Sequence, residues 1–323
     1  MHIPENYLSP ATCAVMAAAA VPVIAVAVKK VRSEVTRAKL PMLGVGAAFS
    51  FLLMMLNLPL PGGTTGHAVG GTLIAILLGP WSAALSVSTA LIIQAFLFGD
   101  GGILSLGANI FNIAFILPFV GYAVYKLISG DGKSKGREYA AVAVGSWFGL
   151  NAAALFTAVE FGLQPLLFKG ADGLPLYCPY PLSVAIPAMM IPHMLVAGVA
   201  EALFTVLIVA YIRKVSPGDI YEGERKRPKG LYALVVALIA AVPLGLLAAG
   251  TAWGEWGAEE IGELAGYVPA GLAGGFEFSA IMPDYTISGL PEIPGYILSA
   301  IFGAAITIVL FRLIAGLAKE KKS

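Results

Sequence analysis

Charged residues are scarce in this chain of 323 residues, and their scarcity excludes an ordinary soluble domain. Asp, Glu, Lys and Arg together make up 12% of the sequence, whereas typical globular proteins contain about 25%. Hydrophobic residues make up 58%, and the mean hydropathy is +0.85. The net charge of +1 comes with basic residues spread over short loops, so no nucleic-acid-binding patch is expected. The composition predicts a membrane protein.

Cysteines and the sequence motifs of common enzymes are also missing. The chain has two cysteines, Cys13 and Cys178, which form no disulfide framework and no CxxC motif, so we interpret them as packing and loop residues. The sequence contains no GxxxxGK[ST], no HExxH and no GxSxG. We therefore expect no enzyme, and any ATP hydrolysis would belong to separate subunits. The absence of an internal repeat typical of secondary transporters favours that source of energy over an ion gradient.

Apolar segments recur along the whole chain at lengths near the roughly 17 to 25 residues that cross a bilayer. They cover about residues 9–28, 40–58, 64–79, 81–98, 104–125, 139–160, 182–212, 231–250 and 293–314. The third segment is the shortest. We therefore expect an all-α, polytopic integral membrane protein of the cell membrane with about nine transmembrane helices.

The charged loops predict how the helices are oriented. Lys and Arg cluster at 29–39, 133–137, 213–229 and 319–322, which are alternate connections and the C-terminal end. Because cytoplasmic loops carry the excess of Lys and Arg, the N-terminus should lie outside and the C-terminus in the cytoplasm. The outer segment 251–292 holds seven acidic residues and no Lys or Arg. It is either a solvated acidic loop or one that attracts cations.

Histidine occurs three times, and one copy follows the first methionine. The first ten residues carry no Lys or Arg, so we expect no cleaved signal peptide. His is too large to favour removal of Met1. The Met1 amine, the His2 amide nitrogen and the His2 ring Nδ1 can then occupy three corners of a square, a geometry that suits Ni(II) or Cu(II). His67, in PGGTTGHAVGG on the same predicted outer side, offers a fourth nitrogen.

Simpler interpretations of these residues stay open. His2 alone is typical of a disordered terminal side chain, and His67 alone of a hydrogen-bonded residue at a helix start. Polar residues within the predicted spans usually face the interior of a helical bundle. Gln94, Asn109, Asn112 and Asn151 are expected to make interhelical hydrogen bonds. His193 and Glu201, about 12 Å apart along a helix, support the alternative of a gradient-driven cation carrier or channel with a proton relay.

Four stretches of the sequence resemble one known family. They are MHIPENYLSP at the start, GHAVGG around His67, LIIQAFLFGDGGILSLGANIFNIAF at 91–115 and PHMLVAGVAEALFT at 192–205. Together they resemble the substrate-binding membrane subunit of nickel/cobalt energy-coupling-factor transporters, the CbiM/NikM family. The remaining part, with PDYTISGL at 283–290, is similar to the NikN-type or PDGLE-type partner that some members carry fused, although the literal sequence PDGLE is absent.

The resemblance implies two parts and a transport function. Residues 1–215 would form the metal-binding membrane domain, and 216–323 a two-helix unit with an acidic outer loop. The family binds its metal through the residues that correspond to Met1, His2 and His67. Its partners are a membrane-embedded coupling protein and two ATP-hydrolysing subunits. Ni(II) or Co(II) would be the transported substrate, with no resident cofactor. We favour nickel, because square-planar nitrogen sites suit it best.

Overall fold

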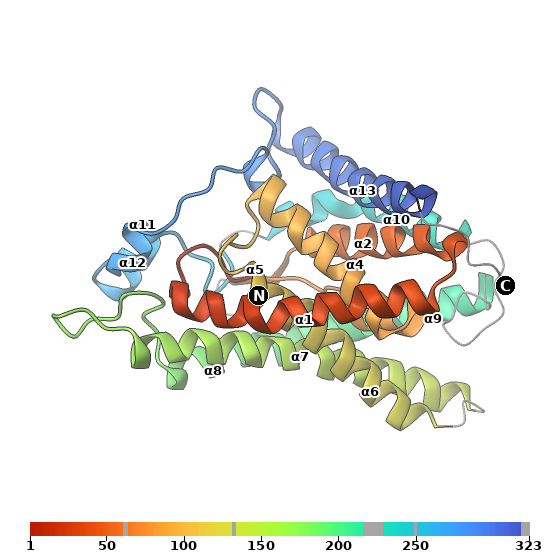
Figure 1. Ribbon diagram of the computed structural model, residues 1–323, viewed down its shortest axis with the longest axis horizontal. Helices are drawn as coiled ribbons and strands as arrows, with labels where there is room; N and C mark the ends of the chain where they lie inside the picture. Colours follow the sequence, from red (N-terminus) through yellow and green to blue (C-terminus); the bar gives the residue numbers. More distant parts are fainter. Residues whose placement is uncertain (61–63, 131–133, 216–228, 249–250, 318–323) are drawn as a thin grey trace.

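The computed structural model describes residues 1–60, 64–130, 134–215, 229–248 and 251–317, and nearly all of its regular structure is helical. Most of the longer helices run along the long axis of the molecule (Figure 1). Among the described residues the two named strands, β1 (Leu58–Leu60) and β2 (Thr64–Gly66), form one small antiparallel pair. The all-α prediction is therefore confirmed.

In the part of the chain that the structure describes, six helical segments are long and apolar enough to cross a membrane. They are α1 (Pro10–Glu34); α4 (Pro80–Ile93) with the π-helical turn η2 (Gln94–Phe98); α5 (Leu106–Asn109), η3 (Ile110–Ile116) and α6 (Leu117–Ser129); α7 (Lys135–Leu167); α8 (Leu182–Pro192), η4 (His193–Ala197) and α9 (Gly198–Val215); and α13 (Glu292–Leu317). A multi-pass membrane protein, as the sequence predicts, follows from these lengths. The count of nine crossings stays a prediction.

The shorter elements connect or fill the spaces between these helices. They are η1 (Arg37–Lys39), α2 (Leu40–Met54), α3 (Gly71–Leu78), α10 (Lys229–Ala241) with η6 (Val242–Leu247), α11 (Ala258–Ala265), α12 (Ala270–Ala273) and η7 (Pro283–Tyr285). The expected helix over 64–79 is wrong in extent, because β2 occupies its start. Gly70 then takes a left-handed φ of 73° before α3 begins. The eight residues of α3 rise about 12 Å, far less than the roughly 30 Å of a hydrocarbon core.

Helix α2 lies at the centre of the molecule, where every residue from Met42 to Met54 is buried. Both α10 and α13 pack against it (Figure 1). The two backbones come close together at Gly44, where an added Cβ would lie 2.9 Å from the Thr307 carbonyl oxygen of α13. Small residues at helix contacts let two backbones come together in this way. The C-terminal helices are thus packed directly on the core of the N-terminal part.

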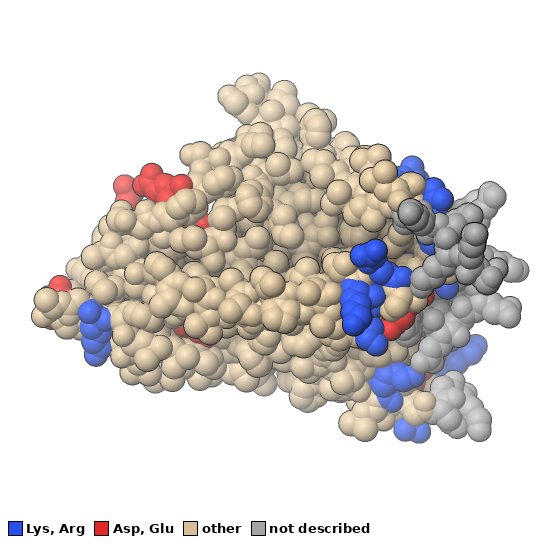
Figure 2. Space-filling model, viewed as in Figure 1, with Lys and Arg blue, Asp and Glu red and all other residues tan. Residues whose placement is uncertain are grey.

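The charges of the described residues are separated along the long axis. Most visible Lys and Arg side chains gather at one end, whereas the largest visible acidic group lies toward the other (Figure 2). The helix ends near the basic pole include the end of α1, the start of α7 and the end of α9 (Figure 1). Glu138 of α7 and Arg213 of α9 form an ion pair there. This separation agrees with the loop charges used for the predicted orientation, which itself stays a prediction. Cys13 and Cys178 are buried and free of disulfides.

Candidate metal site at the N-terminus

The first residues of the chain are buried in the protein rather than frayed. Met1 and His2 are each 2% exposed, and Ile3 is fully buried. The amide side chain of Asn109, just before η3, holds Ile3 from both sides. Its Oδ1 accepts from the Ile3 N–H at 2.8 Å, and its Nδ2 donates to the Ile3 carbonyl at 3.0 Å. The interpretation of His2 as a disordered terminal side chain is therefore wrong.

Glu5 anchors the same segment to the turn that follows η2. Its carboxylate accepts from the backbone N–H groups of Ile103 and Leu104 at 2.5 and 3.0 Å. Burial raises the pKa of Glu5, and these two backbone hydrogen bonds act against the rise. The Ser105 hydroxyl donates to the Ile3 carbonyl at 2.6 Å. Side chains and backbone groups of residues 100–109 therefore hold the N-terminal segment in place through hydrogen bonds.

The two histidines predicted as ligands face each other. The ring centroids of His2 and His67 are 4.9 Å apart, and the Nε2 atom of each is buried without a hydrogen-bond partner. The Nδ1 atom of His67 lies 3.2 Å from the Ala68 carbonyl, which leaves Nε2 as the free nitrogen. Burial, followed by the positive charges at the N-terminus and His2, holds the pKa of His67 well below its ordinary value. A neutral imidazole is the form that binds metals.

The Met1 amine lies in the same region and pairs with an acidic residue far along the chain. Its nitrogen is 3.0 Å from Oε1 of Glu255, which is 24% exposed. Glu255 belongs to the segment just before α11. The sequence located an acidic loop here but did not single out Glu255, because the pair joins residues 254 positions apart.

Asp100 is the other carboxylate beside the histidines, and our sequence interpretation gave it no role. Its Oδ1 lies 2.5 Å from Nδ1 of His2, and its Oδ2 accepts from Gln94 at 3.1 Å and from the Tyr285 hydroxyl. Burial would raise the pKa of Asp100, but the charge of His2 and the hydrogen bonds from His2 and Tyr285 outweigh it and keep that pKa well below its ordinary value.

A local signal for Asp100 was present in FGDGG. Gly99 and Gly101 on either side have φ values of 71° and 82°, and glycine adopts this left-handed conformation without steric cost. The turn presents the aspartate toward His2. A lone acidic residue between glycines at the end of an apolar span was the feature to notice.

A cavity of about 500 Å³ opens beside these groups. His2, His67 and Asp100 line it from the N-terminal part, and Glu255 and Tyr285 from the C-terminal part. Among the described residues, no group of three or more His, Cys, Asp or Glu side chains is arranged to hold a metal ion. A metal bound here would therefore need backbone nitrogens together with the two imidazoles.

His193 and Glu201, the residues of the alternative carrier hypothesis, each bond to the protein backbone. Nδ1 of His193 is 2.7 Å from the Met189 carbonyl in its own helix. The Glu201 carboxylate accepts from the backbone N–H groups of Val69 and Gly70 at 2.7 and 3.0 Å. Glu201 thus fixes the start of α3, directly after His67. The structure assigns these two residues to separate backbone partners and does not bring them into one hydrogen-bonded pair.

The other predicted interior polar residues also make hydrogen bonds. The Gln94 amide donates to Asp100 and to the Tyr285 hydroxyl oxygen. The Asn112 amide donates to Thr157 and Glu160, which both belong to the neighbouring helix α7. Asn151 donates to the Trp147 carbonyl in its own helix at 2.8 Å. The expectation of interhelical bonds is therefore confirmed for Asn112 and wrong for Asn151, whose amide donates within α7.

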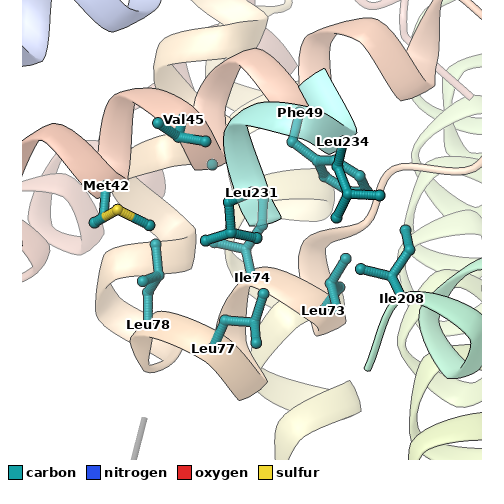
Figure 3. Close-up of a pocket in the computed structure, with 11 residues that line it drawn as sticks. Met42, Val45, Phe49, Leu73, Ile74, Leu77, Leu78, Ile208, Leu231 and Leu234 are labelled. Atoms are coloured by element: carbon teal, nitrogen blue, oxygen red, sulfur yellow. The ribbon is translucent and has the colours of Figure 1, made fainter. Parts of the chain in front are cut away.

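A second, apolar cavity lies where α10 packs on the core. Leu231 and Leu234 of α10 point toward Phe49 of α2 and Leu73 of α3 (Figure 3). Its volume is about 20 Å³ and its lining is entirely hydrophobic. It offers no metal ligand, so the N-terminal cavity is the better candidate site.

Two protein families match this chain in sequence. Residues 2–218 match the family described as "cobalt uptake substrate-specific transmembrane region", CbiM. Residues 227–320 match the PDGLE domain.

Two curated relatives are similar over nearly the whole chain. The probable fused nickel transport protein LarMN of Lactiplantibacillus plantarum is 49% identical over 321 residues, covering 97% of each chain. The fused nickel transport protein NikMN of Rhodobacter capsulatus is 47% identical over 341 residues, covering 98% of each.

A solved structure gives the same result for the N-terminal part. The crystal structure of a truncated transition metal transporter is 57% identical, with a TM-score of 0.63, and the match covers 67% of this chain and 99% of that one. These family matches and the relatives that align over nearly the whole chain show that it belongs to the CbiM family of nickel and cobalt transport proteins and carries a fused PDGLE domain.

Proposed function

We propose that this chain is the substrate-binding membrane subunit of an ATP-driven energy-coupling-factor transporter that imports Ni(II) or Co(II). The observation that supports it most directly is the buried Nε2 atom of His67, which has no hydrogen-bond partner and belongs to a ring whose centroid lies 4.9 Å from that of His2. Buried polar atoms in folded proteins are normally hydrogen-bonded. An unpaired ring nitrogen at the wall of a cavity is therefore available to bind a metal ion. The names of the relatives, which are nickel transport proteins, agree.

The proposed ligands are the Met1 amine, the amide nitrogen and ring Nδ1 of His2, and the ring of His67. The first three form one five-membered and one six-membered chelate ring, and the free Nε2 of His67 supplies the fourth nitrogen. Four in-plane nitrogens suit Ni(II). Cu(II) would bind at least as tightly in the Irving–Williams order, so discrimination against copper rests on its supply to the transporter.

Two contacts must change when the metal binds through these atoms. The Met1 amine must lose its proton and leave Glu255, and Nδ1 of His2 must leave Asp100. A half-turn of the His2 ring about its Cβ–Cγ bond frees Nδ1 and brings the Nε2 edge toward the side on which Asp100 lies. Metal-ligating histidines commonly donate their second N–H to a carboxylate in this manner.

The proposed partners are a membrane-embedded coupling protein and two ATP-hydrolysing subunits. Their support is the absence of a phosphate-binding GxxxxGK[ST] motif from the full sequence. We assign residues 1–215 to the metal-binding domain and 216–323 to a two-helix unit, which the family matches at 2–218 and 227–320 support.

The test uses purified protein with its native first residue. One added residue before Met1, or His2→Ala, should abolish stoichiometric Ni(II) binding measured by calorimetry, because each removes nitrogens from the chelate. His193→Ala should leave the stoichiometry unchanged. The native protein should show a diamagnetic Ni(II) site with the d–d band of four in-plane nitrogens. Full binding after N-terminal extension would refute the chelate.

Reconstitution separates this function from the gradient-driven alternative. In vesicles, the chain alone should not accumulate Ni(II) under an imposed proton gradient, and ATP-dependent uptake should require the coupling and ATPase subunits. Proton-driven uptake by the isolated chain would favour the carrier with His193 and Glu201.

A further inference from the structure

We propose that Tyr285, supplied by the C-terminal part, is a positioning residue for the metal site, because its hydroxyl holds Asp100 and Asp100 holds the His2 ring. This inference rests on the proposed function and assigns the C-terminal part a defined task in it. That part would complete the outer shell of the metal site.

The carboxylate of Asp100 bridges the two parts of the chain. Its Oδ1 bonds Nδ1 of His2, and its Oδ2 accepts from the Tyr285 hydroxyl. Gln94 steadies both partners, since its Nε2 lies 3.1 Å from Oδ2 of Asp100 and 3.0 Å from the Tyr285 oxygen. The two oxygens of this carboxylate thus connect the proposed ligand His2 to a tyrosine that lies 185 positions beyond Asp100.

Tyr285 is itself held firmly. It is 8% exposed, and its ring stacks on Phe98 of η2 with centroids 4.7 Å apart and 24° between the planes. The Ser299 hydroxyl of α13 donates to its carbonyl at 2.8 Å. The backbone N–H of Met282, three residues earlier, donates to the Leu97 carbonyl of η2 at 2.8 Å. The tyrosine is thus docked on the helix turn that leads into Asp100.

The backbone of this turn is strained. Asp284 and Tyr285 have φ values of 52° and 59°, and neither is glycine. Such conformations persist where the surrounding structure over-determines them, and they cluster at functional sites. Tyr285, one of these two strained residues, is also the residue of η7 whose side chain donates a hydrogen bond to Asp100. The observed placement therefore has a specific use in orienting Asp100.

The chemical role of Tyr285 is to restrict the His2 ring. Asp100 is bonded to Nδ1 of His2 in the metal-free structure. After the half-turn of the ring, the same carboxylate would accept from the Nε2–H and leave Nδ1 to the metal, because the hydrogen bond of one ring nitrogen sets which nitrogen is free to bind. The carboxylates that accept this bond are commonly hydrogen-bonded in turn. Without the tyrosine hydroxyl, Asp100 keeps only the Gln94 donor besides His2, and both the carboxylate and the ring gain freedom to rotate.

The test compares Ni(II) binding by three full-length proteins with native N-termini: wild type, Tyr285→Phe and Tyr267→Phe. Tyr267 lies in the same C-terminal part but outside the residues that line the metal cavity. Tyr285→Phe should raise the Ni(II) Kd by about 10-fold to 100-fold, the usual effect of losing an outer-shell partner, and should shift the d–d band. Tyr267→Phe should change neither quantity.

A double-mutant cycle with Asp100→Ala distinguishes positioning from general destabilisation. In the Asp100→Ala background, Tyr285→Phe should have almost no further effect on the Kd. A wild-type Kd for Tyr285→Phe, or the same loss with and without Asp100, would overturn the inference. Thermal unfolding of the metal-free proteins is measured alongside, and a Kd change that only follows lost stability would overturn it too. If wild type binds no Ni(II), the proposed function has failed, whereas normal wild-type binding with an unaffected Tyr285→Phe variant refutes the inference alone.

Discussion

At the residue scale, the candidate site consists of nitrogen atoms whose competing partners are carboxylates. The Met1 amine pairs with Glu255, and the His2 ring with Asp100. Each contact joins a buried nitrogen to a carboxylate that is partly exposed at the wall of the cavity. A metal that binds these nitrogens would replace their protons. The same carboxylates are close enough to accept a released proton. His67 differs, because its Nε2 has no partner to give up.

Metal affinity should therefore fall as the pH is lowered from about 8 to 5. The amine and amide must release protons to bind the metal, and each released proton contributes about a tenfold change per pH unit. His67 adds little to this slope, since its pKa is held well below the ordinary value and the ring is already neutral. Calorimetric Ni(II) titrations at several pH values measure the effect. A constant Kd over this range would contradict the chelate.

Asp100 should not contribute to that slope. Its folded-state pKa is depressed below its ordinary value of 3.8. The stability from its ionised contacts is therefore fully present above the ordinary value and is lost only as the pH falls below it, through the folded-state pKa. Between pH 5 and 8 the carboxylate remains ionised.

At the scale of secondary-structure elements, irregular helix geometry and one buried carboxylate determine where the ligands lie. The π-helical turn η2 leads through Gly99 into Asp100, and η3 begins directly after Asn109, which holds Ile3. Short π-helical turns inside α-helices are frequent at functional sites. Helix α9 contributes Glu201, which is fully buried and binds the backbone that follows His67.

Glu201→Ala should weaken metal binding without removing a ligand. The variant leaves the N–H groups of Val69 and Gly70 without their acceptor, at a cost of about 1–3 kcal/mol for each buried group, and loosens the loop that carries His67. Thr205→Val is the matched control, since the Thr205 hydroxyl donates to the Glu201 carbonyl within α9 and not to the loop that carries His67. Thermal unfolding and the Ni(II) Kd measure both effects. An unchanged Kd in Glu201→Ala would refute this role.

At the scale of the whole molecule, the C-terminal part contacts the N-terminal part in two places. Helix α13 packs on the buried helix α2, and the segments before α11 and at η7 reach the metal cavity. The contact of α13 with α2 is about as close as backbones allow at Gly44. The packing of the helices and the completion of the site are therefore expected to be coupled.

Gly44→Ala should test this coupling. The new methyl group would meet the Thr307 carbonyl, and overpacking of this kind costs about 1–3 kcal/mol. Gly316→Ala near the end of α13 is the control, because no atom lies within 4 Å of its added Cβ and helix propensity favours alanine by up to about 1 kcal/mol. Thermal unfolding should show a lower Tm for Gly44→Ala only. Equal Tm values for both variants would contradict the tight α2–α13 contact.

Several features could be predicted from the sequence because they depend on the average properties of neighbouring residues. Hydropathy over windows of about 20 residues identifies membrane spans, and it located α1, α7 and α13. The same procedure failed at 64–79, where Gly70 and its neighbours interrupt an apolar run that a window average treats as continuous. Chelate chemistry at the first two residues pointed to Met1, His2 and His67, whose metal-binding role stays a prediction.

The sequence by itself determined that this is an all-α membrane protein, with its apolar helices, its charge clusters and a histidine beside the first residue. Only the tertiary structure decided that His2 lies against His67 and that Asp100, Glu255 and Tyr285 surround the N-terminus. The physical reason is that hydropathy and charge patterns are read over about 20 neighbouring residues at most. The pairs that build the site join residues 65 (His2 with His67) to 254 (Met1 with Glu255) positions apart, and packing in three dimensions alone selects such partners.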